Sequence, residues 1–280
     1  MRTLVVTADD VGLHPGLTQG ALKAHDEGIV TACSVVANGP ALEDALERLR
    51  DRPKLDVGVH LTFVGERPLS PPDRVRSLLG PDGAFLPGFR AFAARYFLGK
   101  IRTEEIEIEL RAQIERLQAA GLKLVHANSH QHLHALPRIF EIVLKLAEEH
   151  RIPWVRLPAD PAFRLTPRAL EIAVLNAIGR QARRTTQRRT VRTLPRTVGI
   201  LDAGRLTPTR LIQILKDVGP AAELVCHPGI GDRELAKAYD WGYGWDAETA
   251  ALCDPEVRRA LREGGIEVMG FSGLGEALGR

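Results

Sequence analysis

The sequence predicts an α/β fold of the (β/α)-barrel type, in a distorted or incomplete form. Short apolar runs rich in β-branched residues alternate with longer helical patterns, which predicts parallel strands joined by right-handed crossovers. About eight such units fit into 280 residues, as a barrel requires. Polar residues follow most of the runs, where a barrel carries its active site. A doubly wound sheet is the alternative, because periodicity alone does not separate the two folds.

Each element is predicted from its local pattern. The expected strands are Thr3–Ala8, Cys33–Asn38, Asp56–Leu61, Lys123–Asn128, Trp154–Leu157, Val198–Leu201, Glu223–His227 and Ile266–Gly270. The expected helices are Gly16–Glu27, Pro40–Arg50, Glu104–Ala120, Pro137–His150, Pro167–Arg183, Pro208–Asp217 and Pro255–Glu263. Proline opens most of these helices, as is typical of a first helical turn. Glu104–Ala120 has the clearest helical spacing, with apolar residues at Ile106, Leu110, Ile114 and Leu117.

We expect one domain spanning residues 1–280, with two segments outside the alternation. Residues 62–99 are rich in proline and glycine and form an expected insertion over the active face. The end of this insertion carries apolar residues at helical spacing. They form either a face packed in the core or one wall of a groove for an apolar tail, in which Phe92 and Phe97 would contact the substrate. Residues 180–196 are dense in arginine, either as a solvated surface or as a site for anionic headgroups.

Composition narrows the functional classes. The net charge of +3 is too small to argue for nucleic acid. Cys33, Cys226 and Cys253 are far apart and form no CxxC pair. Cys33 and Cys226 lie in apolar runs, so buried reduced thiols are expected there. No signal peptide is expected, since the first apolar run is short and ends at two aspartates. No apolar stretch approaches the ~18 residues needed to span a membrane. A cytoplasmic protein is therefore expected.

Two adjacent carboxylates, Asp9 and Asp10, follow the first apolar run. Adjacent carboxylates repel each other, and burying either one is costly without a cation or a hydrogen-bond donor. A metal ion would resolve this conflict, with one aspartate as ligand and the other free as a base. The alternative is a solvated turn in which Asp10 caps the next helix.

Histidines at other strand ends favour the metal hypothesis. His60 ends the third predicted strand, and His130, His132 and His134 follow the fourth. Alternate residues of an extended chain point the same way, so two or three of these histidines can line one wall. One aspartate and two histidines with open positions are typical of a hydrolytic metal site. Zinc suits these ligands, and Mg, Mn, Ni or Fe stay open. The alternative for His60 is a histidine packed in the core. The alternative for the histidine run is a solvent-exposed loop that binds no metal.

Three further polar residues lie at strand ends. Asn38 ends the second predicted strand, Arg156 lies near the end of the fifth, and His227 ends the seventh. His227 comes from a different strand than the candidate ligands, so it can face the substrate across the pocket as a general acid. The alternative is a histidine that caps the Pro228-Gly229 turn. Asn38, His132 and Arg156 are expected to bind substrate.

Four motifs, in order, resemble the YdjC-like (ChbG-type) carbohydrate deacetylase family. They are Ala8-Asp-Asp-Val-Gly, Val57-Gly-Val-His-Leu, His126-Ala-Asn-Ser-His-Gln-His-Leu-His and Cys226-His-Pro-Gly. The resemblance runs from Thr3 to about Phe271. It implies metal-dependent N-deacetylation of acetamido sugars on a barrel-like fold. By motif, Asp9 matches the catalytic base, Asp10, His60 and His130 match the ligands of a divalent metal, and His227 matches a histidine that assists catalysis.

A narrower resemblance concerns the substrate. Asn128 stands where the family commonly has aspartate, which puts the metal affinity in question. Together with residues 201–207 and the arginine-dense segment, Asn128 looks most like the hopanoid-biosynthesis (HpnK-like) branch. That branch implies an N-acetylglucosaminyl hopanoid lipid as substrate, with a chitooligosaccharide as the alternative. The expected partners are the acetamido sugar, the inner membrane face as a peripheral contact, and a second copy of the chain. A metal-dependent phosphoesterase and a non-catalytic sugar-binding protein are the alternatives of other classes.

Overall fold

The computed structural model describes residues 2–158 and 189–278, with Ala177, Gly179, Arg183, Thr185 and Thr186 between them. Its strands are β1 (Arg2–Val11), β2 (Ala32–Val35), β3 (Asp56–Leu61), β4 (Leu124–Ser129), β5 (Trp154–Val155), β6 (Thr197–Val198), β7 (Ala221–Cys226) and β8 (Ile266–Val268). They form one sheet in the order β5-β4-β3-β2-β1-β7-β6, and β8 also pairs with β1. All named pairings are parallel. The predicted barrel-like α/β fold is confirmed.

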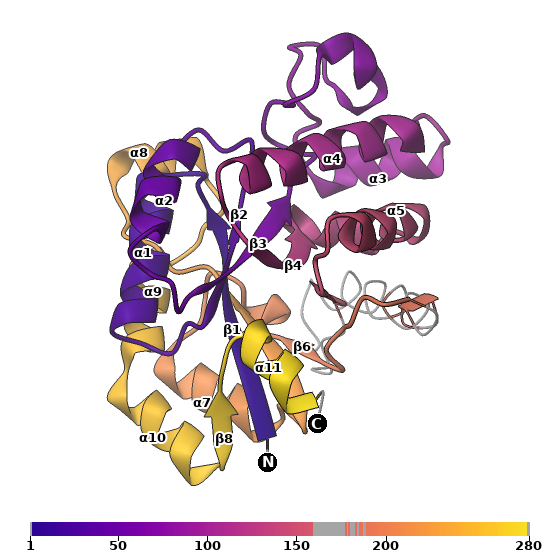
Figure 1. The fold of residues 1–280 in the computed structure, drawn as a ribbon. Helices are drawn as coiled ribbons and strands as arrows, with labels where there is room; N and C mark the ends of the chain where they lie inside the picture. Colours follow the sequence, from indigo (N-terminus) through magenta and orange to yellow (C-terminus); the bar gives the residue numbers. More distant parts are fainter. Residues whose placement is uncertain are drawn as a thin grey trace.

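The place of β8 explains why the barrel is incomplete. A regular barrel would insert its last strand between β7 and β1. Here β7 pairs directly with β1 along Thr3–Ala8. β8 pairs only with Arg2–Leu4 of β1. It lies on the same edge of β1 as β2, which pairs with β1 further along, from Thr7. Figure 1 shows β8 beside the start of β1, at the end of the sheet where both chain termini lie. The sheet therefore curls without the regular strand order of a closed barrel.

The helices follow the predicted alternation. Those near predicted segments are α1 (Pro15–Asp26), α2 (Leu42–Leu49), α3 (Phe89–Phe97), α4 (Thr103–Ala119), α5 (Pro137–Glu149), α7 (Pro208–Lys216) and α10 (Pro255–Glu263). The chain also forms α8 (Arg233–Ala238), α9 (Trp245–Cys253) and α11 (Phe271–Leu278), which were not predicted. Single 3₁₀ turns cover Pro72–Arg74, Arg76–Leu78, His130–Ala135 and Ile200–Asp202. The predicted helix Pro167–Arg183 lies largely outside the described residues.

Two predicted extended segments are wrong. The strand predicted over Val198–Leu201 stops at Val198, because Gly199 has a φ of 91° and the chain turns into a 3₁₀ segment. The histidine run is likewise not extended, since a 3₁₀ segment starts at His130. Gln131 and His132 there have φ values of 54° and 55°. His130 and His132 still line the same cavity, but through this turn and not by alternation along an extended chain.

Helix α4 holds the insertion in place. Its apolar residues are buried in the core as predicted, and a second stripe of buried polar side chains binds the backbone of residues 62–77. Gln113 exchanges hydrogen bonds of 2.9 and 2.6 Å with the backbone of Thr62. Glu109 accepts from the backbone N–H groups of Leu69 and Ser70. Figure 1 shows α3, α4 and α5 gathered beyond β3 and β4, so the insertion is carried by this side of the molecule.

The cysteines behave as expected from their apolar surroundings. Cys33 and Cys226 are free and buried, and Cys253 is free and half-buried. Burial raises the pKa of both buried thiols, so they stay protonated. Among the residues described, no helix combines the length and the apolar character that crossing a bilayer requires.

Candidate active site

A bulge in β1 turns two adjacent carboxylates toward one cavity. Ala8 pairs with Cys33 and Val11 pairs with Val35, so β1 carries one residue more than β2 between these pairs. Asp10 lies within this irregularity with a φ of 67°, a left-handed conformation that aspartate tolerates better than most residues. In a regular strand Asp9 and Asp10 would face opposite sides. Here both side chains line the same cavity.

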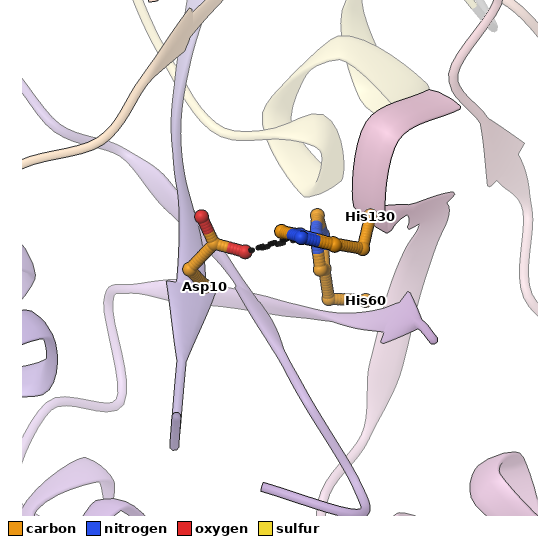
Figure 2. Close-up of side chains that lie close together, drawn as sticks. All are labelled: Asp10, His60 and His130. Carbon is orange, nitrogen blue, oxygen red and sulfur yellow. Dashed lines mark hydrogen bonds and ion pairs between the residues drawn. The ribbon is translucent and has the colours of Figure 1, made fainter. Parts of the chain in front are cut away.

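Asp10, His60 and His130 converge as the candidate ligands of one metal ion (Figure 2). Asp10 Oδ1 lies 3.0 Å from His130 Nδ1 and 3.2 Å from His60 Nε2. One possible ligand atom from each residue lies within 4.8 Å of the others. His60 Nε2 is buried and has no partner apart from its contact with Asp10, as a nitrogen reserved for a cation would be. The three residues come from β1, from β3 and from the turn after β4.

Asn128 sets the orientation of His60. The Asn128 amide nitrogen donates to Asp9 at 3.0 Å, which directs its oxygen toward His60 Nδ1 at 2.8 Å. His60 Nδ1 can then donate to that oxygen, which leaves the Nε2 lone pair free to face Asp10 and the cation. An aspartate at position 128 could accept from His60 but could not donate to Asp9. The asparagine therefore serves both neighbours, which a carboxylate would not.

Asp9 is held by a buried network beneath the candidate ligands. Its carboxylate accepts hydrogen bonds from Ser34 at 2.7 Å, from Asn128 at 3.0 Å, and from both terminal nitrogens of Arg156 at 2.5 and 2.9 Å. Arg156 also donates to Glu223 at 2.8 Å. Burial raises the pKa of Asp9, but the charges of Arg156, His60 and His227 together with the Arg156 hydrogen bonds outweigh it, so this pKa lies well below its usual value. Asp9 is therefore ionised at neutral pH.

The charges of this cluster fit a divalent cation. Asp9, Asp10 and Glu223 are three buried carboxylates that share one buried guanidinium, that of Arg156. Burial raises the pKa of Asp10, yet the neighbouring His130 and His60 bring it well below the usual range. Arg156 contacts Asp9 and Glu223, whereas Asp10 has the two imidazoles as its neighbours. A divalent ion held by Asp10 and neutral imidazoles would supply positive charge beside this carboxylate.

His227 lies on the other side of the aspartates from His60 and His130. It follows Cys226, which pairs with Ala8 on β1. Its backbone N–H donates to Glu248 at 2.7 Å, and its Nδ1 has no hydrogen-bond partner. Burial lowers the pKa of His227 and raises that of Glu248 to about 8. Glu248, which α9 supplies, thus fixes the turn that carries His227, and the sequence pattern gave no sign of this.

The walls of the cavity come from the insertion and from an aromatic segment. The cavity measures about 600 Å³, and residues 87–91 of the insertion form part of its lining. Trp241 and Tyr243 line it as well; their rings lie 5.2 Å from the rings of His130 and His227, respectively. Neither residue was among the predicted site residues. The signal is visible in Tyr239-Asp-Trp-Gly-Tyr-Gly-Trp, where aromatic residues recur at every second position.

Four of the five expected substrate-binding residues lie away from the cavity. His132 lines it, and its Nδ1 has no hydrogen-bond partner. Arg156 is 2% exposed and engaged by Asp9 and Glu223, so it positions Asp9 instead of meeting substrate. Phe92 is fully buried against Phe63.

The remaining two expected contacts have other surroundings. Asn38 donates to the backbone carbonyl of Arg67 and so ties the insertion to the end of β2. Phe97 is 70% exposed at the end of α3. Phe89, at the start of the same helix, lines the cavity.

The arginine-dense segment is described only in part. Arg183 donates to the backbone carbonyl of Pro195, Arg189 pairs with Glu148, and Arg192 lies over the ring of Trp154. Arg196 donates to the backbone carbonyl of Asp217. Arg180, Arg184 and Arg188 lie outside the described residues. The described arginines are thus used in local contacts, as a solvated surface segment would use them.

A curled parallel sheet with one aspartate and two histidines at its carboxyl edge defines a barrel-like protein with a candidate mononuclear metal centre. The chain belongs to the YdjC-like protein family, which matches residues 3–263. It is 33% identical over 274 residues to a carbohydrate deacetylase of Brevibacillus brevis, covering 97% of this chain and 99% of the relative.

Two further comparisons agree with this family. A carbohydrate deacetylase of Geobacillus stearothermophilus is 31% identical over 272 residues, covering 96% of this chain and 97% of the relative. Among solved structures, a protein of Enterococcus faecalis V583 proposed to cleave cellobiose-phosphate matches with a TM-score of 0.78 at 26% identity, covering 98% of both chains.

Proposed function

We propose that this chain is a metal-dependent N-deacetylase that releases acetate from an N-acetylglucosamine-type sugar. The observation that carries the proposal is the convergence of Asp10, His60 and His130 beside the Asp9–Arg156 pair in one cavity. Membership of the YdjC-like family and similarity to carbohydrate deacetylases along nearly the whole chain support it. The cavity volume of about 600 Å³ lies in the usual range for small-ligand sites.

The cation would be held by Asp10 Oδ1, His60 Nε2 and His130 Nδ1. A carboxylate with two imidazoles suits zinc best, and Mg, Mn, Ni or Fe are the other candidates. When bound, such an ion acts as a Lewis acid toward a carbonyl oxygen and lowers the pKa of water. Asn128 contributes by fixing the direction of the His60 imidazole through its Nδ1.

Asp9 and His227 divide the proton transfers of amide hydrolysis. The oxygen of water bonds to the acetyl carbon, the C–N bond breaks, and acetate and a sugar amine are formed. Asp9, kept ionised and fixed by Ser34, Asn128 and Arg156, takes the proton of the attacking water. His227 lies beside the aspartates in the cavity wall and gives a proton to the leaving nitrogen. Glu248 positions this histidine through its backbone N–H.

The acetamido group alone does not set the substrate class, since the metal centre would contact only that group. We propose an N-acetylglucosaminyl lipid, such as a hopanoid, over a soluble chitooligosaccharide. Phe97 and Leu98, each 70% exposed, form an apolar pair at the end of the helix whose start lines the cavity. Burying apolar surface contributes roughly 25 cal/mol per Å², so such a pair can favour a peripheral contact with the inner membrane face.

The decisive experiment measures acetate release from both substrate classes. The protein is stripped with a chelator and reloaded with Zn, Mn, Mg, Ni or Fe. In the wild type, activity should disappear after chelation and return when metal is added. In Asp10→Ala, added metal should not restore activity. The lipid-linked sugar should have the higher kcat/KM, and Phe97→Ser/Leu98→Ser should lower that preference.

The outcomes separate the two parts of the proposal. Equal or better turnover of chitooligosaccharide by the wild type would remove the lipid substrate and leave the deacetylase. Metal-dependent cleavage of a phosphate ester without acetate release would overturn the deacetylase itself.

A further inference from the structure

A second cavity adjoins the first one. It measures about 430 Å³ and shares Pro87, His130, Gln131 and Trp241 with the first cavity. A ligand whose acetamido group lies at the candidate metal centre can therefore extend past Trp241 into this space. Glu66 and Tyr239 line only the second cavity. The second cavity therefore offers a ligand a carboxylate and a phenol that the first cavity does not have.

Glu66 gives the second cavity an acidic wall. Its backbone carbonyl accepts from the N–H of Phe85 at 2.8 Å, which fixes this part of the insertion. Its carboxylate accepts a hydrogen bond from the Tyr239 hydroxyl at 3.0 Å. Neither a lysine nor an arginine is among the described residues that line the cavity, and none of them forms an ion pair with Glu66. Burial raises the pKa of Glu66 and outweighs the lowering effect of the Tyr239 hydrogen bond and of the nearby His130.

Aromatic rings complete this wall. The Tyr239 and Trp241 ring centroids lie 4.9 Å apart with planes inclined by 52°, so the two rings form a corner beside the carboxylate. The faces of tyrosine and tryptophan attract cations, and tryptophan does so most strongly. A carboxylate next to such faces attracts a cation through both charge and the ring quadrupole. The same corner would repel a phosphate or a carboxylate.

We infer that the second cavity binds a protonated amino group on the unit next to the acetamido sugar. This inference rests on the proposed deacetylase function. The ammonium would give Glu66 the cationic partner that the described residues do not supply, and Trp241 would lie against the ring that carries the amine. Among sugar chains, the preferred substrate is then one that already has one free amine beside the acetamido group.

A pocket that selects an amine also constrains the order of the reactions. Deacetylation converts an acetamido group into an amine, which is the group that the second cavity selects. An enzyme with this pocket acts faster next to a unit that has already been deacetylated. The reaction that supplies its best substrate is therefore another N-deacetylation, carried out by this protein or by a different one.

The test compares disaccharides that differ only in the second unit. The substrates are the diacetylated disaccharide of N-acetylglucosamine and its two mono-deacetylated forms, with the metal-loaded protein. At least one mono-deacetylated form should be hydrolysed with a kcat/KM about tenfold higher than the diacetylated one, the scale of one charge-assisted hydrogen bond. Glu66→Gln should abolish this preference and leave the diacetylated substrate nearly unaffected. Glu234→Gln, an exposed glutamate on α8, is the matched control and should keep the preference.

A binding experiment separates failure of this inference from failure of the deacetylase function. The fully deacetylated disaccharide is titrated calorimetrically at slightly acidic pH, where its amines are protonated. Its affinity should fall about tenfold in Glu66→Gln and stay unchanged in Glu234→Gln. Equal affinity for wild type and Glu66→Gln would overturn the amine site whether or not acetate is released. Equal kcat/KM for all three disaccharides would overturn it as well.

Discussion

The floor and the rim of the candidate site are built from different interactions. The floor comprises Asp9, Ser34, Asn128, Arg156 and Glu223, all buried and joined by hydrogen bonds and ion pairs. The rim comprises Tyr239, Trp241 and Tyr243, which are half-buried and meet mainly through their rings. Charges in a low-dielectric interior interact strongly, whereas ring contacts near solvent contribute less. We therefore expect the floor to govern reaction and stability, and the rim to govern the choice of substrate.

The largest effect is expected when the charge at the centre of the floor is removed. Asp9→Asn preserves the shape of the side chain but loses the proton acceptor, so kcat should fall roughly 10²–10⁴-fold. Metal content, measured on the purified variant, should stay at the wild-type level because Asp10, His60 and His130 are unchanged. Turnover within a fewfold of wild type would remove Asp9 from the role of base.

Breaking the ion pairs of the floor should cost stability. Arg156→Leu leaves two buried carboxylates without their cation, which typically costs about 3–5 kcal/mol of unfolding free energy. The matched control is Arg189→Leu, because Arg189 pairs with Glu148 at a side-chain exposure of 35%. Such exposed pairs contribute about 0–1 kcal/mol. Denaturant unfolding measures both variants, and equal losses would contradict the difference drawn between buried and exposed pairs.

The pH dependence of stability gives a third test, at His126 on β4 below the floor. Burial lowers the pKa of His126 to about 3, so the folded protein keeps it neutral while the unfolded chain titrates near pH 6.5. Its contribution to stability is complete above about pH 6.5 and is lost as the pH falls toward 3, by up to about 1.4 kcal/mol per pH unit. His126→Phe keeps the stacking on Phe271 and should flatten this dependence. If the unfolding free energies of wild type and His126→Phe fall equally between pH 7 and 4, this role of His126 is wrong.

The smallest effect is expected at the rim. Trp241→Leu removes the ring beside His130 and should raise KM more than it lowers kcat, with kcat/KM falling about 2- to 12-fold. Its unfolding free energy should change less than that of Arg156→Leu. Steady-state kinetics measures KM and kcat of this variant, and the same denaturant titration measures its unfolding free energy. A large stability loss with unchanged KM would reverse the roles assigned to floor and rim.

Much of the fold and part of the site could be predicted from the sequence. All eight predicted strands have a counterpart, because β-branched runs between helical patterns are a local signal. Asp10, His60 and His130 come together because parallel strands bring their carboxyl ends to one edge. The neighbours of Arg156 could not be predicted, since Asp9 lies 147 positions away in sequence and Glu223 lies 67 away. No local pattern reports such distant pairing, nor the left-handed turn at Gln131 and His132 that carries the histidine run away from an extended path.

The bulge in β1 has a consequence for moving this site to another scaffold. A pleated strand assigns side chains alternately to its two faces, and the extra residue at Asp9–Asp10 shifts that phase by one step. A pair of aspartates grafted onto a regular strand would send one carboxylate to the wrong face. A transplant therefore has to carry the irregular backbone, with a residue at position 10 that tolerates a φ of 67°. Aspartate meets that requirement and keeps the ligand oxygen, whereas β-branched residues do not tolerate this backbone.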